Sequence, residues 1–292
     1  MLRTEDLPGL FRAADEAAIA SQRSYLRSYG LRLLFAVLAA VCAAFSVRVG
    51  SQRTDLAALG TALAFVCILT LDVRILGSRP NRNWHAGRIL AEATKTLAWK
   101  YAVGGAPFDH TLTRTEADAQ LVDRTWQLQR SFLEIQLEPT TGTTITDRMR
   151  ELRDGMFADR RQCYLEHRLQ EQQRWYAAKS KHHRRRGGRL RTLALLLEIA
   201  GISAALAKAF NAIGFDLAGI VAASIAGIAA WSSARQDDRV SAAYAATSNE
   251  LALITESVRN AGETDWAAAV DDAEEVINRE HALWRAFCVD EL

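Results

Sequence analysis

Four stretches of the chain contain almost only apolar side chains, and they come in two closely spaced pairs. The first pair covers residues 31–50 and 56–77, and the second pair covers residues 190–210 and 213–234. Each stretch is close to the roughly 20 residues that an α-helix needs to cross the hydrocarbon core of a bilayer. Buried helices of soluble proteins are usually shorter and carry a polar stripe on one face. The pattern therefore predicts four transmembrane helices.

The connectors within the two pairs are short, at about residues 48–55 and 210–216. Short connectors between helices of this length join antiparallel neighbours, so each pair forms a hairpin that returns the chain to the side it left. No convincing alternation of apolar and polar residues predicts a strand. The expected fold is all-α: an integral membrane protein with two parallel-oriented two-helix hairpins, four transmembrane helices and long cytosolic helices.

Basic residues near the ends of transmembrane helices favour the cytosolic side. The connectors contain few of them, namely Arg48, Arg53 and Lys208. The outer flanks of the hairpins contain many more: Arg23, Arg27, Arg32, Arg74, Arg79, Arg82, Arg88, Arg235 and Arg239, together with a basic cluster between residues 179 and 191. This bias predicts that both termini and the long central region lie in the cytosol.

Helical patterns also fill the chain between the hairpins. One helix is predicted from Asn83 to the break at Pro107. A capping box of Thr113 and Glu116 opens another helix, which is expected to continue to about Leu137. These helices would extend the protein beyond its membrane segments.

A heavily charged helical stretch is predicted at residues 146–181, with a break at Gly155. Glycine adopts backbone conformations that other residues avoid, so we expect Gly187 and Gly188 to form a flexible joint at the entrance to the third apolar segment. Pro139 opens the sequence PTTGTT, which is typical of a linker.

This linker, at residues 139–145, divides the chain into a first hairpin domain at residues 1–138 and a second hairpin domain at residues 146–292. In both halves a helix with basic and tyrosine residues enters the membrane, a hairpin follows, and a helix leaves. Because the halves have the same orientation, this repeat differs from the inverted repeat of many transporters.

The formal net charge of +2 gives no general attraction to nucleic acid, so no nucleic-acid partner is expected. The chain has no P-loop, nucleophile elbow, HExxH motif or glycine-rich nucleotide motif. We therefore expect no enzyme activity, no catalytic residues and no cofactor. His182 and His183 lie among basic residues that would repel a cation, so no metal site is expected either.

Three acidic residues lie within the apolar segments and are candidates for lining or gating a pore. Glu198 is near the middle of the third segment, where a carboxylate is costly unless it faces protein or water. A pore-lining role and a hydrogen-bonded packing role both stay open for it. Asp72 and Asp216 lie nearer the segment ends, where exposure to lipid headgroups is the simpler interpretation.

Small residues recur four apart on the fourth segment at Gly219, Ala223 and Gly227. Such a face allows two helix backbones to approach closely. The contact could join two copies of the chain or two helices of one copy, and both interpretations stay open.

The basic cluster contains Lys179, Lys181, Arg184, Arg185, Arg186, Arg189 and Arg191. Binding of an anionic nucleotide is one interpretation. Contact with anionic lipid headgroups is the favoured one, because each such charge near the surface contributes about 1 kcal/mol. The bilayer is therefore the first expected partner.

Two groups of residues resemble the signatures of a known family. The first group follows the first hairpin and consists of Trp84, Arg88, Glu92, Lys95, Trp99, Pro107 and Phe108. The second group precedes the third segment and consists of Tyr164, Arg168, Trp175 and Tyr176. The first group resembles one subtype of SLATT domain, and the second half of the chain resembles another, the domain of unknown function 4231. Together the resemblances cover most of residues 12–285.

SLATT domains are two-helix membrane domains associated with bacterial nucleotide-second-messenger and SLOG conflict systems. The resemblance implies an anti-phage type of effector in the bacterial inner membrane, which forms a homo-oligomer and forms or gates an ion-permeable pore. It brings no catalytic residues. Activation would come from a separate sensor protein or a nucleotide signal. The alternative is a non-conducting scaffold or adaptor that recruits cytosolic partners through its long helices.

Overall fold

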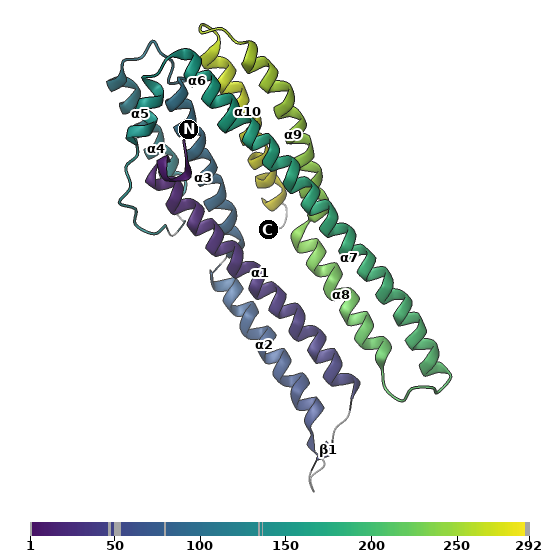
Figure 1. Ribbon diagram of the computed structural model, residues 1–292. Coiled ribbons are helices and arrows are strands. Elements are labelled where there is room, and N and C mark those ends of the chain that lie inside the picture. The colour runs from purple at the N-terminus through teal and green to yellow at the C-terminus, as the bar shows by residue number, and fades with distance from the viewer. Residues whose placement is uncertain are drawn as a thin grey trace. The chain divides into compact units, whose positions relative to one another are not determined.

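The computed structural model describes residues 2–45, 48–49, 54–78, 80–133, 135 and 137–289 (Figure 1). Its elements are η1 (Thr4–Asp6), α1 (Gly9–Ala44), β1 (Arg48–Val49), β2 (Thr54–Asp55), α2 (Leu56–Ser78), α3 (Pro80–Val103), α4 (Arg114–Arg130), α5 (Asp147–Arg153), α6 (Phe157–Tyr164), η2 (Leu165–Gln170), α7 (Glu171–Ala209), α8 (Leu217–Arg235), α9 (Asp237–Asn260) and α10 (Trp266–Val289). Helices dominate this list, so the all-α prediction is confirmed.

The chain folds into two compact units, and each unit takes residues from both halves of the sequence. Unit 1 consists of Met1–Gln22, Asn81–Lys181 and Ser241–Leu292, and unit 2 consists of Arg23–Pro80 and His182–Val240. Helices α1, α7 and α9 each contribute residues to both units. The division of the sequence at residues 139–145 stays a prediction. That segment contains no helix or strand, and the Thr143 carbonyl accepts a hydrogen bond from the Gly9 N–H.

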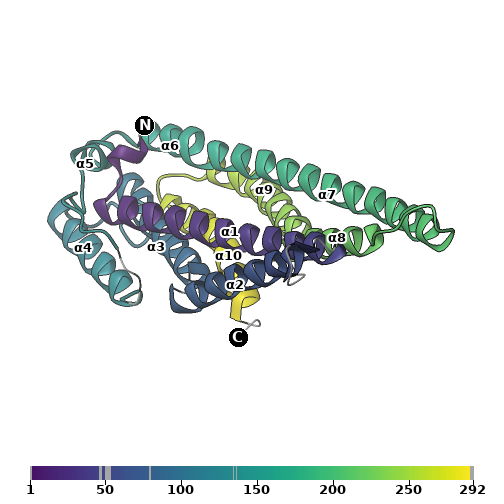
Figure 2. The same ribbon diagram turned by 90° about the horizontal axis from the view of Figure 1, so that it is seen from below.

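Unit 1 contains the hydrophobic core. The core is made mainly of buried side chains from the residues that flank η1 and from the start of α1, α3, α4, α5, α6, η2, α7, α9 and α10. Its large members include Trp99, Phe108 and Trp266. Tyr164 packs edge-on against both Trp99 and Trp266. Figure 2 shows α3 and α10 near one another within this unit. Unit 1 therefore has a packed interior of its own, although a few large apolar side chains, among them Val122, Trp126 and Leu253, are exposed on it.

The helices of unit 1 begin and end at residues with the expected chemistry. Pro80 takes the first position of α3, where its missing N–H costs nothing. Thr113 and Glu116 form the predicted capping box at the start of α4. After α3, Gly104 has a φ of +74°, a left-handed conformation that glycine adopts without steric cost.

Unit 2 has the opposite construction. Among the described residues, the contiguous hydrophobic core includes no residue of unit 2. Leu63, Leu69, Ile199 and Ile202 are among the many large apolar side chains that it exposes. Four helices of the described part are long and apolar enough to span a membrane by length and composition. This surface indicates a membrane protein, because lipid can cover apolar side chains that water cannot.

The two hairpins of unit 2 contact one another through α1 and α8. Figure 1 shows α1 beside α2 and α7 beside α8. The Tyr29 hydroxyl donates a hydrogen bond to the Ala230 carbonyl, and the Tyr29 ring lies 6.3 Å from the ring of Trp231. Just after the end of α1 and just before the start of α8, the rings of Phe45 and Phe215 stack at 5.4 Å.

Two element ends differ from the sequence expectations. Helix α1 ends at Ala44 rather than near residue 50, because the connector forms a short antiparallel ladder in which Val49 pairs with Thr54. The expectation of no strand is therefore wrong at this connector, where β-branched residues suit extended backbone. The basic residues Arg53 and Arg79 lie outside the described residues.

Helix α4 ends at Arg130 rather than near Leu137. The apolar side chains of Phe132, Ile135 and Leu137 continue the helical pattern, but they pack against the core from a loop. Tertiary contacts therefore override the local periodicity at this end. By contrast, the predicted break at Gly155 is confirmed, since it separates α5 from α6.

The expectation of a flexible joint at Gly187 and Gly188 is wrong, because α7 continues through both residues. Gly187 is buried, and a Cβ atom there would lie 2.9 Å from Oδ1 of Asp238. Gly188 is exposed, with no atom within 4 Å of such a Cβ. Gly187 therefore serves close packing of α7 against the start of α9, not flexibility.

We expect Gly187→Leu to destabilise the protein by about 1–3 kcal/mol, because the side chain would be forced into a filled space. Gly188→Leu is the matched control, and it should be neutral or stabilising, since leucine favours a helix over glycine by up to about 1 kcal/mol. Thermal unfolding followed by circular dichroism in one detergent compares the two. Equal melting temperatures for both variants would contradict the packing role.

Candidate functional site

The most deeply buried ion pair that the structure describes lies in unit 1, between Arg168 and Glu274. Their side chains are 1% and 0% exposed. The Arg168 Nε donates to Glu274 Oε1 at 2.8 Å, and its Nη2 donates to Oε2 at 2.6 Å, so the pair is bidentate. Parallel N–H···O bonds of this kind fix geometry as well as adding energy.

Two hydroxyl groups complete the pair. The Tyr164 hydroxyl donates to Glu274 Oε1 at 3.1 Å, and the Thr96 hydroxyl donates to Oε2 at 2.7 Å. Burial alone would lower the pKa of Arg168, but the Glu274 carboxylate outweighs it, so the pKa lies above its ordinary value. Burial and the same carboxylate raise the pKa of Tyr164. The cluster therefore holds one fixed positive and one fixed negative charge.

Elements from both halves of the chain position this cluster. Thr96 lies on α3, Tyr164 ends α6, and Arg168 lies on the π-helical segment η2. π-Helical turns are rare and occur frequently at functional sites. Glu274 lies on α10, four residues after buried Val270.

The sequence analysis missed Glu274. The signal that marks it is its place on the apolar stripe of α10, where Trp266, Val270, Ala273 and Ile277 are all buried. A carboxylate on such a stripe needs a buried cation. The stripe alone does not identify which of the chain's arginines is the partner.

A pocket of about 510 Å³ lies beside this cluster in unit 1. Its volume is within the range of about 300–1,000 Å³ that is typical of small-molecule sites. Apolar walls come from Leu2, Leu7, Phe11, Trp99 and Trp175. The polar lining combines both halves of the chain: Arg3, Thr4, Asp15, Arg88, Glu92, Lys95, His167, Arg168, Glu171 and Gln172.

Arg88 pairs with one oxygen of each of two carboxylates that line the pocket, and the other oxygen of Glu92, Oε2, makes no hydrogen bond. Arg88 Nη2 lies 3.0 Å from Glu92 Oε1, and its Nη1 lies 3.7 Å from Asp15 Oδ1. Its guanidinium also lies over the Trp175 ring, 5.9 Å from the centroid. Burial would lower the pKa of Arg88, but Glu92 and neighbouring groups outweigh it and raise the pKa. A third carboxylate, that of Glu171, lies 3.3 Å from His167 Nδ1.

Lys95 differs from the other charged groups of the pocket. Within the described part of the chain, its ammonium group has no hydrogen bond and no ion pair. Burial lowers the pKa of Lys95; Glu92 opposes this, whereas Arg168 and Arg88 lower it further. Nη1 of Arg168 also has no hydrogen-bond partner.

The residues that resemble the family signature gather mainly in and around the core of unit 1. Trp99, Phe108, Tyr164 and Tyr176 are buried in it, and Glu92 is nearly so. Trp84 stacks on His85 at 4.6 Å, and burial lowers the pKa of that histidine. Pro107 follows the end of α3, just before Phe108. Much of the signature therefore describes packing, while Arg88, Glu92, Lys95, Arg168 and Trp175 also line the pocket.

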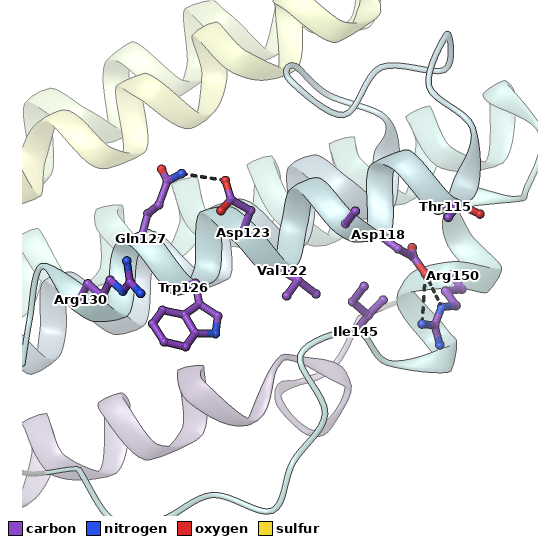
Figure 3. A pocket seen from close by; sticks show the side chains of 10 residues that line it. Thr115, Asp118, Val122, Asp123, Trp126, Gln127, Arg130, Ile145 and Arg150 are labelled. Atoms are coloured by element: carbon purple, nitrogen blue, oxygen red, sulfur yellow. Dashed lines mark hydrogen bonds and ion pairs between the residues drawn. The ribbon is translucent and has the colours of Figure 1, made fainter.

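A second hollow, of about 690 Å³, lies along α4 (Figure 3). Its polar side chains pair with one another: Arg150 Nη2 lies 3.1 Å from Asp118 Oδ2, and Gln127 donates to Asp123 at 2.7 Å. Val122 and Trp126 are 43% and 56% exposed there. The hollow is therefore an apolar patch with a satisfied polar edge.

The three acidic candidates of the apolar segments have different surroundings in unit 2. Asp72 pairs with Arg32 at 3.1 Å, which joins α2 to α1. Asp216 caps α8 by accepting from the Gly219 N–H, and it pairs with Lys208 at 3.1 Å. Glu198 is exposed on α7 and has neither a hydrogen bond nor an ion pair with any described residue.

The small-residue face of α8 approaches α1 at Gly227. A Cβ atom at Gly227 would lie 3.7 Å from Val37 Cγ2, whereas one at Gly219 would meet the Asp216 carboxylate of its own helix cap. Ala223 is partly buried. The structure thus gives Gly227 a partner within the chain, and a role of the face in an oligomer stays a prediction.

The basic cluster on α7 meets two acids at the start of α9. Asp237, 1% exposed, lies 2.6 Å from His183 and 3.7 Å from Arg186. Asp238 pairs with Arg191 at 2.7 Å. Arg191 is exposed although it is paired, and five further exposed residues of the cluster make no ion pair with a described residue, namely Lys179, Lys181, Arg184, Arg185 and Arg189. These five remain the ones available to anionic lipid.

Comparison with known protein families gives two matches in tandem. Residues 8–161 match the family described as SMODS and SLOG-associating 2TM effector domain 3. Residues 164–284 match the family described as SMODS and SLOG-associating 2TM effector domain 1. The tandem resemblance of the sequence analysis is confirmed. No curated protein and no solved structure matches the chain.

We expect Arg168→Met to destabilise unit 1 by about 3–5 kcal/mol, because it leaves a buried carboxylate without its cation. Thermal unfolding in detergent, followed by tryptophan fluorescence, measures the loss. The double variant Arg168→Met/Glu274→Leu should recover part of it, since neither charge then remains.

The matched control is Arg114→Met, which removes an exposed pair with Asp154 at 3.3 Å. Exposed pairs contribute about 0–1 kcal/mol, so this variant should melt close to the wild type. If Arg168→Met and Arg114→Met melt together, the buried pair is not a major source of stability.

Proposed function

Because the chain belongs to the SMODS and SLOG-associating 2TM effector domain family, we propose that it is a membrane effector of a bacterial conflict system. In this proposal several copies assemble through unit 2 and form or gate an ion-permeable path. A sensor protein or a small-molecule signal supplies the trigger, and the activity has an anti-phage role.

The single observation that carries the proposal is the position of Glu198. This carboxylate lies within the apolar stretch at residues 190–210 on α7, is exposed, and has no partner among the described residues. A carboxylate facing hydrocarbon is costly, so it needs protein or water beside it. A second copy of the chain would place protein beside Glu198, and an aqueous path would place water there. Asp72 and Asp216, by contrast, already have partners within the chain.

The exposed apolar surface of unit 2 agrees with this arrangement. Many large apolar side chains of its helices are exposed, and this surface is left for lipid or for further copies. In a bilayer, lipid is as apolar as leucine, so association depends on close packing and on polar contacts. Glu198 and the small-residue face of α8 supply candidates for such contacts.

We further propose that both termini face the cytosol and that the protein lies in the bacterial inner membrane. Support comes from exposed basic residues at the outer flanks, such as Arg23, Arg27 and Arg184.

A fusion at the C-terminus tests this orientation. Alkaline phosphatase placed there should stay inactive, and a fluorescent protein placed there should fluoresce, because the first needs the periplasm and the second folds in the cytosol. The reverse pair of results would invert the topology and remove the basis for placing the termini.

The direct test of conduction is ion flux from liposomes that contain the purified protein. We expect flux in the wild type and a change of at least about tenfold in Glu198→Gln, which keeps the size of the side chain but removes its charge. Ser203→Ala, on the same helix, is the matched control and should conduct like the wild type.

Impermeable liposomes containing an intact oligomer would favour the alternative, a non-conducting scaffold. The exposed Val122 and Trp126 of α4 favour that alternative, since such a patch can take a partner protein. A scaffold would keep its biological activity in Glu198→Gln and lose it in Trp126→Ala, the opposite of the effector pattern.

A further inference from the structure

The pocket beside the Arg168–Glu274 pair contains positively charged donors that the protein itself does not satisfy. Each carboxylate lining it has a cationic or imidazole neighbour: Asp15 and Glu92 have Arg88, and Glu171 has His167. Among the cationic groups, the Lys95 ammonium makes no hydrogen bond or ion pair with a described residue, and Nη1 of Arg168 is buried without a hydrogen-bond partner. Among the carboxylates, Oε1 of Glu92 pairs with Arg88, whereas its Oε2 makes no hydrogen bond.

Arg168 is the stronger of these two observations. Its side chain is 1% exposed, and a buried guanidinium donor without an acceptor is costly. The Nε and Nη2 atoms of Arg168 donate hydrogen bonds to Glu274, so Nη1 is the guanidinium nitrogen that Glu274 does not bind. Nη1 itself is closed to solvent in the structure, so an acceptor bound in the pocket, which Arg168 also lines, would reach this donor through a small shift of the guanidinium.

We propose that this pocket is a binding site for a phosphate or carboxylate group of a small molecule, held by Lys95 and Arg168. Both are donors without acceptor capacity, and an oxyanion accepts from both at once. The apolar walls formed by Leu7, Phe11 and Trp99 suit the uncharged part of the same ligand.

The site needs both halves of the chain. Phe11, Asp15 and Lys95 come from the first matched domain, whereas Arg168, Glu171 and Trp175 come from the second. A single two-helix domain would supply only one of the two unsatisfied donors. The inference does not depend on conduction, because binding is measured on the closed or inactive protein.

Inorganic phosphate is the probe, titrated by isothermal calorimetry against the full chain in a neutral detergent, with sodium chloride at matched ionic strength as the blank. We expect saturable binding by the wild type. Lys95→Met should weaken it about tenfold or more, which corresponds to about 1.4 kcal/mol.

Two further variants separate binding from folding. Lys95→Arg keeps the charge and should retain most of the affinity. Arg124→Met removes an exposed positive charge of α4 that does not line the pocket, and it should bind phosphate like the wild type. If the wild type shows no saturable binding, or if Lys95→Met binds as tightly as Arg124→Met, the proposed site is wrong.

The oxyanion could belong to a soluble molecule or to a lipid headgroup, and nanodiscs distinguish these sources. Phosphate binding that disappears in phosphatidylglycerol nanodiscs, but persists in phosphatidylcholine nanodiscs, identifies an anionic headgroup as the natural occupant. Equal binding in both identifies a soluble ligand. Either result supports the site, provided that the Lys95→Met substitution abolishes the phosphate binding.

Discussion

The bidentate ion pair between Arg168 and Glu274 joins helices that are far apart in the sequence. Two charges removed from water are stable only while each has the other and its remaining hydrogen bonds are made. Glu274 meets this condition through Tyr164 and Thr96, so α3, α6, η2 and α10 have to come together for either charge to be tolerated. The tandem domains therefore share one folded unit, although they match separate family descriptions.

In unit 2, by contrast, many of the large apolar side chains are exposed. Asp72 and Asp216, near the ends of apolar segments, each pair with a basic residue of unit 2, whereas Glu198 has no ion pair with a described residue. Helices α1 and α7 are each continuous between the two units, so one helix carries Phe11 and Asp15 of the pocket, and another carries Glu171 and Trp175. A ligand in the pocket would thus contact the same helices that form membrane segments.

The sequence predicts features that depend on local chemistry. The apolar stretches identify α1, α2, α7 and α8, and the Thr113–Glu116 box marks the start of α4, because both signals are contained in neighbouring residues. Local propensity alone wrongly predicts a flexible joint at Gly187. In the structure a glycine is favoured there because the Asp238 side chain, which is distant in the sequence, lies where a Cβ atom would be. The pair of Arg168 with Glu274 spans 106 residues, so no local pattern identifies it. The pocket likewise appears only once three segments are assembled.

Whether the assembled protein conducts ions is measured most directly by single-channel recording in a planar bilayer. The effector proposal expects discrete current steps whose size changes when Glu198 loses its charge. Silent bilayers that contain inserted oligomers of verified mass, under every activating condition, would contradict it and leave the protein a membrane scaffold.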